Sequence, residues 1–504
     1  MNRTTDEDAR REGAVETMRS QPYAFPPRTL RRRERRFPQA VDPFELLQAL
    51  RTSQPSILLE SAKGGRYSLV AAGVPGERLR MERGGDLIYT TVDGVEHVLS
   101  GDPIDQLRAL WKRTSMDPGT LPEMFAGGGI GFFSYDFVRL IERIPALNTQ
   151  RFGLPLFDFW FPHAFAVIDH ADDVTVMTAL VDEGSDDDIA EKMLDMMEMG
   201  CGSALGSTSS RSGDSVVDGG AIGIDELLAS VEVVPDRETF ERNVARAVEY
   251  VHAGDVFQVN LSLRLLQKWE GDPIDLYRTL RSINPSPYMT FIELGETVVV
   301  GASPEQLLKV EGESIASRPI AGTRRRGVDE AEDERKIAEL LGDEKERAEH
   351  LMLVDLERND LGRVSRYGSV HVDEFMSVER YSHVLHIVSN VTGQLREECD
   401  LFDAIVALFP GGTITGAPKI RSMEIIEELE PECREIYTGS IGWIGYDGNA
   451  ELNIAIRSIL LKDGVASVQA GAGIVADSHP HFEYRESLKK AAASLLALHH
   501  ARRS

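Results

Sequence analysis

Two pairs of glutamates with the spacing Glu-x-x-Glu are the strongest local sign of chemistry in this sequence. Glu346 and Glu349 form one pair; Glu483 and Glu486 form the other, and Lys490 continues the second stripe. Because a spacing of three places both members on one helix face, like charges repel there. Carboxylates combined with water are ligands that octahedral Mg²⁺ prefers. The pairs therefore indicate either a magnesium site or a solvated acidic face.

A glycine-rich segment at 468–476 satisfies the dinucleotide pattern G-x-G-x-x-A through Gly471, Gly473 and Ala476. That fingerprint needs a helix N-terminus for the pyrophosphate, and residues 477–480 do not open a helix. The segment is therefore predicted to be a tight turn, or to offer backbone N–H groups to a small anion such as a carboxylate.

The elements that position these residues are indicated by hydrophobic periodicity. An apolar helical stripe begins after Asp236, which has the character of an N-cap, and ends at Gly254. The next residues, 257–264, alternate strictly between apolar and polar side chains, which predicts a strand. Its polar row is formed by Gln258, Asn260, Ser262 and Arg264. This row fits either an exposed sheet face or the wall of a cavity.

Composition divides the chain into four regions. Residues 1–37 are predicted to be a polar N-terminal extension, and its basic stretch at 28–36 to pair with an acidic body. Residues 38–199 resemble a mixed α+β region, and 235–498 a second folded region. The Gly- and Ser-rich segment 200–220 between them is predicted to be a linker or loop, since it cannot bury enough apolar surface.

Overall composition excludes several classes of protein. The chain has 504 residues and a formal net charge of −27, which disfavours broad nucleic-acid binding. No apolar run is long enough for a membrane span. The three cysteines are far apart, so neither a disulfide framework nor a cysteine metal cluster is expected. A reduced, cytoplasmic protein is the expectation.

Several segments, taken in order, resemble the chorismate-utilising enzymes. They match closely across about 235–498 and more loosely across 42–170. The segments are 257–262, 284–289, 301–305, 318–323, 343–355, 358–363, 379–383, 416–419 and 469–473. The resemblance implies an α+β fold in which large antiparallel sheets form a sandwich with outer helices and a cleft between them.

The resemblance also implies roles for individual residues. Glu349 and Glu486 would be the principal Mg²⁺ ligands, with Glu346 and Glu483 as partners, and the metal would neutralise the ring carboxylate of chorismate. Arg457 would pair with the other carboxylate. The remaining hydrogen bonds to substrate would come from Thr323, Thr413, Tyr437, Lys490, Gly471 and Gly473.

Three further residues are implied to act on the reacting atoms. Glu305 would be the general acid that protonates the departing C4 hydroxyl, and neighbouring carboxylates would help it to hold a proton. Gln258 would line the route of the attacking ammonia. His386 would serve the later elimination of pyruvate. Together with Lys490 they form the expected catalytic set.

Within the family the sequence is most similar to the large subunit of anthranilate synthase. Aminodeoxychorismate synthases carry a nucleophilic lysine where Ala321 stands, although Asn260 and the segments 412–415 and 451–454 resemble those enzymes. They are therefore the alternative. Gln258 disfavours salicylate and isochorismate synthases, which have a water-activating lysine there. A non-catalytic chorismate or tryptophan sensor is a further alternative, disfavoured because the acidic residues and His386 are all present.

The resemblance implies two partners besides chorismate. Ammonia would come from solution or from a separate glutamine amidotransferase subunit, because this chain lacks the G-x-C-x-G nucleophile elbow. Tryptophan would bind as a feedback inhibitor between two segments of the chain. Its predicted contacts are Glu60, Ser61, Asn284, Pro285, Tyr288 and Met289.

Overall fold

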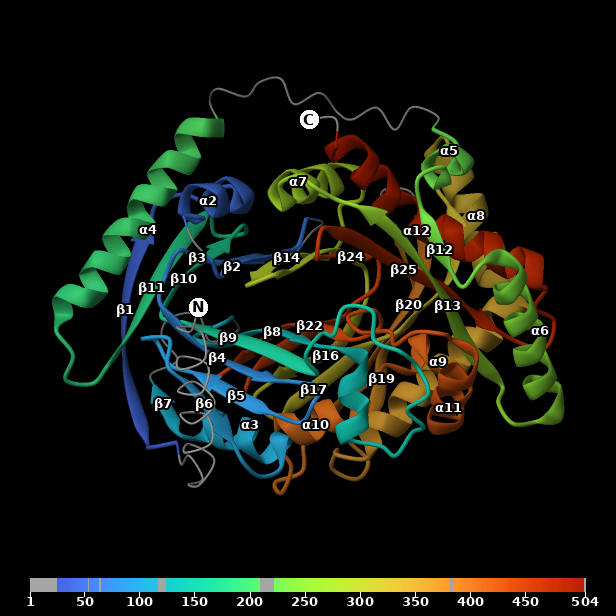
Figure 1. The fold of residues 1–504 in the computed structure, drawn as a ribbon, viewed down its shortest axis with the longest axis horizontal. Helices are drawn as coiled ribbons and strands as arrows, with labels where there is room; N and C mark the ends of the chain where they lie inside the picture. The colour runs from blue at the N-terminus through green and yellow to red at the C-terminus, as the bar shows by residue number, and fades with distance from the viewer. Residues whose placement is uncertain are drawn as a thin grey trace, which may run out of the picture.

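Two large and almost wholly antiparallel β-sheets face one another and form the centre of the molecule (Figure 1). The computed structural model describes residues 25–52, 54–62, 65–116, 124–208, 222–380 and 384–502. Helices cover the outer faces of both sheets. The predicted α+β sandwich with outer helices is therefore confirmed.

The first sheet has 13 strands and the second has 12. In spatial order the first contains β12 (Glu232–Val234), β13 (Gln258–Lys268), β25 (Val465–Ile474), β24 (Ser458–Lys462), β15 (Thr297–Ser303), β14 (Tyr288–Leu294), β2 (Ser56–Glu60), β3 (Tyr67–Ala72), β10 (Ala164–Asp169), β11 (Val174–Asp182), β1 (Arg28–Phe37) and β7 (Thr114–Met116), while β21 (Gly416–Ala417) pairs with β13. The second contains β18 (Ile320–Arg325), β20 (Val384–Gln394), β17 (Ser314–Arg318), β16 (Gln306–Glu311), β23 (Ala450–Ile454), β22 (Ser440–Gly445), β8 (Gly128–Phe133), β9 (Phe157–Pro162), β4 (Gly76–Met81), β5 (Leu87–Thr90) and β6 (Glu96–Leu99), while β19 (His371–Arg380) pairs with β20.

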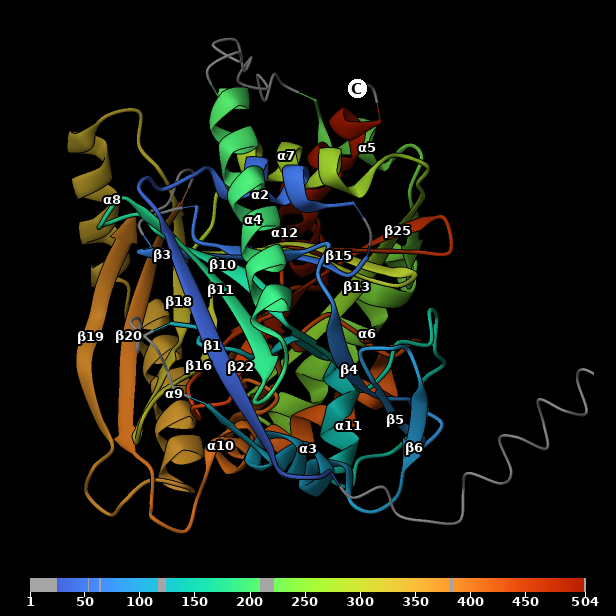
Figure 2. The ribbon, with the colours of Figure 1, turned by 90° about the vertical axis from the view of Figure 1, so that its left-hand side faces the viewer.

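Helices pack on both outer faces of the sandwich. Those on the first sheet include α2 (Pro43–Leu50), α4 (Asp187–Thr208), α6 (Arg237–Ala253), α7 (Pro273–Ile283) and α12 (Pro480–Ala501). Those packed on the second include α8 (Glu330–Gly342), α9 (Glu344–Gly362) and α10 (Leu401–Leu408). The remaining helical segments are α3 (Pro103–Lys112), η1 (Tyr135–Leu140), α5 (Ile224–Leu228), η2 (Gly412–Ile414) and α11 (Lys419–Leu429). Figure 2 shows β19 and β20 as a long pair at one edge of the sandwich, near α8.

The two predicted regions 38–199 and 235–498 share both sheets and do not pack as separate domains. In the first sheet β2 pairs with β14, and in the second β8 pairs with β22. The larger hydrophobic core likewise combines Leu58 and Phe165 with Phe291 and Val300. Long-range strand pairing, which composition does not encode, joins the two halves.

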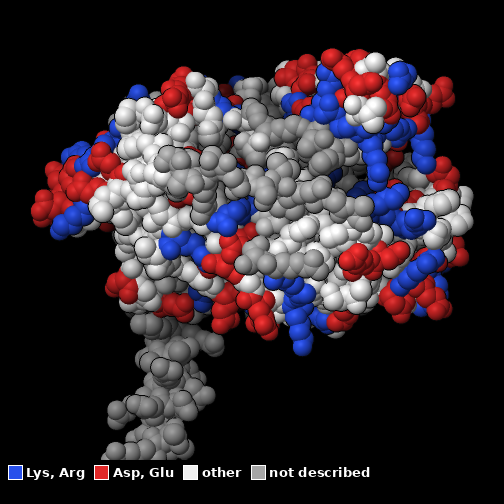
Figure 3. All heavy atoms as spheres, turned by 90° about the horizontal axis from the view of Figure 1, so that it is seen from above, with Lys and Arg blue, Asp and Glu red and all other residues white. Residues whose placement is uncertain are grey.

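The predicted N-terminal extension also needs correction. Its last ten residues form β1, which pairs with β11 and β7 inside the first sheet. The predicted ionic pairing of this basic stretch is confirmed, because Arg35 contacts Glu191, Asp195 and Glu198 of α4. Acidic and basic side chains are interleaved along the projecting edge formed by α4 (Figure 3). Residues 1–24 lie outside the described part of the chain.

The predicted linker at 200–220 is helical where it is described. Helix α4 continues to Thr208, and residues 209–221 lie outside the described ranges. Helix α6 begins and ends as its sequence predicts: the Asp236 carboxylate accepts from the Thr239 N–H at 2.8 Å, and Gly254 adopts a left-handed conformation with φ 81°. No helix in the described ranges is long and apolar enough to cross a membrane.

Candidate active site

The polar row of β13 is buried rather than exposed. Gln258 and Asn260 are 3% and 8% exposed, and β25 runs alongside them. The oxygen atoms Gln258 Oε1 and Asn260 Oδ1 are buried without a hydrogen-bond partner among the described residues. Because an unpaired buried polar atom is costly, these oxygens mark a place where polar groups of a ligand would bind.

Gly471 and Gly473 lie within β25, so the predicted tight turn is wrong. They face β13, where Gly473 pairs with Asn260. A Cβ atom at Gly473 would lie 2.2 Å from Gln258 Nε2, and one at Gly471 would lie 2.9 Å from Asn260 Oδ1. A side chain at Gly473 would displace the Gln258 amide, and one at Gly471 would also meet the Leu261 carbonyl oxygen, 2.3 Å from its Cβ.

The two glutamate pairs lie on α9 and α12, and side chains of the two helices influence one another. The pKa of Glu349 is raised by burial and by the charge of Glu346, while Lys490 of α12 lowers it and Glu486 raises it. Burial and the charge of Glu486 likewise raise the pKa of Glu483. The structure thus brings together two segments more than 100 residues apart, as the predicted site requires.

The chemistry of this acidic group suits a divalent cation, but its oxygens are not arranged as a finished site. Glu346 accepts from Arg324 at 2.8 Å, and Glu486 from Lys490 at 2.9 Å. In the described ranges no three Asp, Glu, His or Cys side chains are placed to hold a metal ion together. Burial, and to a lesser extent neighbouring like charges, raise the pKa values of Glu349 and Glu483, and a bound cation would stabilise their charged forms.

Glu305 lies between β15 and β16 and is 5% exposed. Burial is the largest cause that raises its pKa, to about 7, and the charge of Glu357 acts in the same direction. The Thr413 hydroxyl and the Ile320 N–H, which is 3.4 Å from Oε1, lower that pKa. A carboxyl with a pKa near 7 can hold and release a proton at neutral pH. Burial is thus the main cause of the raised pKa of Glu305, and the predicted effect of a neighbouring carboxylate is a smaller one.

The positive charge of Arg457 acts on two predicted catalytic residues, Glu305 and His386. Arg457 follows β23 and precedes β24, and its backbone adopts a left-handed conformation with φ 51°. Such strain in a non-glycine residue persists only where the surrounding structure imposes it. Its charge lowers the pKa values of both Glu305 and His386. An anionic group of a ligand placed there would meet a fixed guanidinium.

His386 on β20 is held in one orientation by β18. Its Nδ1 lies 3.0 Å from Thr323 Oγ1 and 3.1 Å from the carbonyl oxygen of Gly322. Because a carbonyl only accepts, this contact assigns the proton to Nδ1 and leaves Nε2 with its lone pair. Burial and the charge of Arg457 lower the pKa of His386 to about 4, so the ring is neutral at pH 7.

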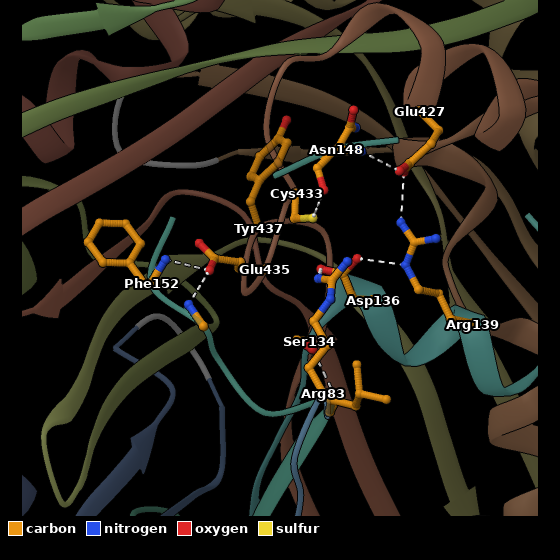
Figure 4. A network of polar contacts seen from close by, with 12 residues as sticks. Arg83, Ser134, Asp136, Arg139, Asn148, Phe152, Glu427, Cys433, Glu435 and Tyr437 are labelled. Carbon is orange, nitrogen blue, oxygen red and sulfur yellow. Dashed lines mark hydrogen bonds and ion pairs between the residues drawn. The ribbon is translucent and has the colours of Figure 1, made fainter. Parts of the chain in front are cut away.

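Lys490 and Tyr437, two predicted substrate-binding residues, come from different elements: Lys490 from α12, and Tyr437 from the connection between α11 and β22. Lys490 Nζ donates to the carbonyl oxygen of Gly471 at 3.0 Å, so it reaches the glycine strand as well as Glu486. Tyr437 is buried, which raises its pKa, and it lies against the guanidinium of Arg434. Figure 4 shows Tyr437 beside the polar network that contains Glu435.

A cavity of about 450 Å³ opens beside the acidic group and was not predicted. One polar wall is the ion pair between Lys345 and Asp477, with a Nζ–Oδ2 distance of 2.9 Å. Glu349 contributes to the lining, and so does Phe257, which is 71% exposed. Phe257 directly precedes Gln258, and alternate strand residues point to opposite faces. The cavity therefore reaches the outer side of the strand that carries Gln258.

The residues predicted to bind tryptophan lie on or beside two neighbouring strands. Met289 of β14 is the register partner of Glu60 in β2, and Asn284 and Pro285 precede β14. Gly65 donates its N–H to Ser61 Oγ at 3.0 Å.

Polar contacts tie this group to α7 and to the general-acid segment. Glu60 accepts from the Tyr277 hydroxyl at 2.5 Å and pairs with Arg281 at 2.7 Å. Tyr288 donates to Gln306 Oε1 at 3.0 Å, next to Glu305.

Two buried or bridging residues near the site were missed by the sequence argument. Arg324 bridges Glu346 and Asp343, and Glu357 lies inside the protein near Glu305. Both lie directly beside segments that carry the family resemblance, and only folding reveals which side chains they meet. Residues 381–383, in the segment 379–383, lie outside the described part.

Comparison with known proteins decides the family. The model of the chorismate binding enzyme family matches residues 54–496. This chain belongs to that family. It is 45% identical over 443 residues to aminodeoxychorismate synthase component 1 of Bacillus subtilis, covering 88% of this chain and 91% of that protein. It is 46% identical over 446 residues to anthranilate synthase component 1 of Thermus thermophilus, covering 88% and 92%.

A solved structure supports the same assignment. The crystal structure of anthranilate synthase component I from Streptococcus pneumoniae matches with a TM-score of 0.71 and 34% identity, over 86% of this chain and 92% of that chain. The family resemblance predicted from sequence is confirmed. As a chorismate binding enzyme, the protein acts on chorismate, and the buried acid, arginine and histidine described above form its candidate active site.

Proposed function

We propose that this protein is the large subunit of an anthranilate synthase in tryptophan biosynthesis. The reaction converts chorismate and ammonia to anthranilate, pyruvate and water. The observation that carries this choice is Ala321 on β18, two residues from Thr323, where aminodeoxychorismate synthases have a nucleophilic lysine. An alanine methyl group cannot form a covalent intermediate.

Substrate binding uses the two carboxylates of chorismate. Arg457 pairs with one of them, and the Lys490, Thr323 and Thr413 side chains with the Gly473 backbone supply further polar contacts. Bound Mg²⁺, held by Glu349 and Glu486 with Glu346 and Glu483, would neutralise the ring carboxylate. The crowded, protonation-prone carboxylates on α9 and α12 support that placement.

Two proton transfers are assigned to groups with opposite protonation states. Glu305, with a pKa near 7, protonates the departing C4 hydroxyl while ammonia attacks C2. His386 is neutral and carries its proton on Nδ1, so its Nε2 can accept a proton in the aromatising elimination of pyruvate.

Ammonia is supplied by a separate glutamine amidotransferase subunit or from solution. Gln258 lies on the strand between the substrate and the cavity of Phe257 and Lys345. Entry of ammonia on this side of the strand is supported by that cavity, which is lined by Phe257, the residue before Gln258.

Aminodeoxychorismate synthase is the second candidate. The Bacillus subtilis relative of that name is 45% identical to this chain, close to the value for the Thermus anthranilate synthase. Its product would retain the enolpyruvyl group and the reaction would release no pyruvate.

One assay separates the two functions. Purified protein is incubated with chorismate, Mg²⁺ and an ammonium salt, and anthranilate fluorescence and pyruvate are followed together. Equimolar anthranilate and pyruvate support the proposal. An aminated, non-fluorescent product without pyruvate supports the alternative, and consumption of no chorismate contradicts both.

Tryptophan is proposed as the feedback inhibitor at the β2–β14 segments. The same assay is repeated with increasing tryptophan. Inhibition that is weakened by Met289→Ala supports this site, whereas an unchanged rate at millimolar tryptophan contradicts it.

A further inference from the structure

Glu357 is a buried carboxyl that none of the assigned roles explains. It lies in the last third of α9, is 2% exposed, and is flanked by the core residues Val354 and Leu361. A carboxyl buried among apolar side chains destabilises the fold unless other groups bind it. Its contacts therefore indicate what it does.

The carboxyl of Glu357 joins two segments from different parts of the chain. Ser317 Oγ on β17 donates to Oε2 at 2.8 Å, and both residues are buried. The backbone N–H of Gly412, the first residue of η2, lowers the pKa of this carboxyl. A Cβ at Gly412 would lie 3.6 Å from Glu357 Oε1, so the loop passes directly over the carboxyl.

Each of these segments continues directly to Glu305. Gly412 is followed by Thr413, whose hydroxyl acts on the Glu305 carboxyl. Ser317 is followed three residues later by Ile320, whose N–H lies 3.4 Å from Glu305 Oε1. The two polar groups that lower the pKa of Glu305 thus come from the two segments beside Glu357.

The charged groups around Glu357 are few. Burial and the charge of Asp360 raise its pKa to about 7, and Lys419 of α11, which pairs with Asp360, lowers it. Glu305 faces it from the β15–β16 connection, and the Glu357 charge contributes to the raised pKa of that residue. The negative charge of Glu357 therefore acts on the carboxyl of Glu305.

We propose that Glu357 is a positioning residue for the general acid. It holds the Gly412–Ile414 loop, which carries Thr413, and the 317–320 segment, whose Ile320 N–H contacts Glu305. This inference rests on the proposed function of Glu305 and adds a residue outside the substrate contacts.

The test is Glu357→Gln, which keeps the shape of the side chain. An amide has one acceptor oxygen and no charge, so one of the two segments loses its acceptor and Glu305 loses a neighbouring negative charge. The expected result is a kcat about tenfold lower at pH 7. The alkaline limb of the pH–rate profile should move to higher pH, because the Thr413 hydroxyl and the Ile320 N–H each lower the pKa of Glu305 more strongly than the charge of Glu357 raises it. The ratio of variant to wild-type rate is measured at each pH, which cancels the change in free ammonia.

The matched control is Glu427→Gln. Glu427 is equally buried, at 3% exposed, and accepts from Arg139 at 2.8 Å and from the backbone N–H groups of Leu147 and Asn148. Figure 4 shows it in the Arg139 network. This variant should lower the melting temperature without moving the alkaline limb.

Two separate measurements test the proposed enzyme activity and the positioning role of Glu357. Wild-type turnover of chorismate in the same assay tests the function, and the variant-to-wild-type ratio tests Glu357. A ratio that stays near one from pH 6 to 9, or a limb shift equal to that of Glu427→Gln, would overturn the proposal. If Glu357→Gln does not fold, Ser317→Ala removes one anchor alone; wild-type kcat in that variant would also overturn it.

Discussion

At the scale of single residues, the protonation of Glu305 governs the expected pH dependence. A general acid works in its protonated form, so turnover should fall as the pH rises through about 7, the raised pKa of this group. Glu305→Gln cannot donate a proton and should lower kcat by at least about a hundredfold at all pH values. Steady-state rates from pH 5 to 9 check both expectations.

Thr413→Val should change the pKa of Glu305 without removing its carboxyl. The Thr413 hydroxyl lowers the pKa of Glu305, so its removal should move the alkaline limb to higher pH. A limb that is unchanged in Thr413→Val, together with full activity in Glu305→Gln, would contradict the role of this carboxyl.

At the scale of elements, β13 and β25 approach closely because β25 carries two glycines at the site. In Gly473→Ala the new methyl group meets the end of a flexible side chain, Gln258 Nε2. The fold should survive while kcat/KM falls, because Gln258 is displaced. In Gly471→Ala the methyl group lies 2.3 Å from the Leu261 carbonyl oxygen, so stability should fall by about 1–3 kcal/mol. Denaturant unfolding and kinetics distinguish the two variants; equal effects on stability would contradict this explanation.

Charged side chains of α9 and α12 act on one another, which supports a prediction about Mg²⁺ binding. Glu486→Ala should abolish turnover while the folded structure, measured by circular dichroism, remains intact. Mg²⁺ should raise the melting temperature of the wild type, because it binds only the folded state, and should have no such effect on this variant.

Glu344→Ala is the control for the metal prediction. Glu344 is exposed on the first turn of α9, so the variant should keep both turnover and the Mg²⁺ effect. Full activity in Glu486→Ala would refute the assignment of Glu486 to the metal.

At the scale of the whole molecule, both halves of the chain complete both sheets. A fragment that begins at residue 222 would lack β2 beside β14 and β8 beside β22, exposing the edges of two central strands. It should aggregate when expressed alone and become soluble when coexpressed with residues 1–221. Size-exclusion chromatography is the measurement. A monodisperse fragment with cooperative unfolding would show that the halves are independent domains.

Sequence alone predicted the features that depend on local spacing. The paired glutamates on helix faces, the caps of α6 at Asp236 and Gly254, and the alternation along β13 follow from helix and strand periodicity. The ordered motifs added the family and, through it, the sandwich fold and the prediction that Glu305 is the general acid.

Only the tertiary structure decided which polar residues are buried and what they face. Alternation could not show whether the polar row of Gln258 lines the interior, because burial depends on β25 and β21, which are distant in sequence. For the same reason, the sequence alone predicts an extension at residues 28–37, which form β1, and a tight turn as one of two possibilities at Gly471 and Gly473, which lie in β25. The sequence did not single out Glu357, because its proposed role arises from contacts with strands and loops that only the fold brings to it.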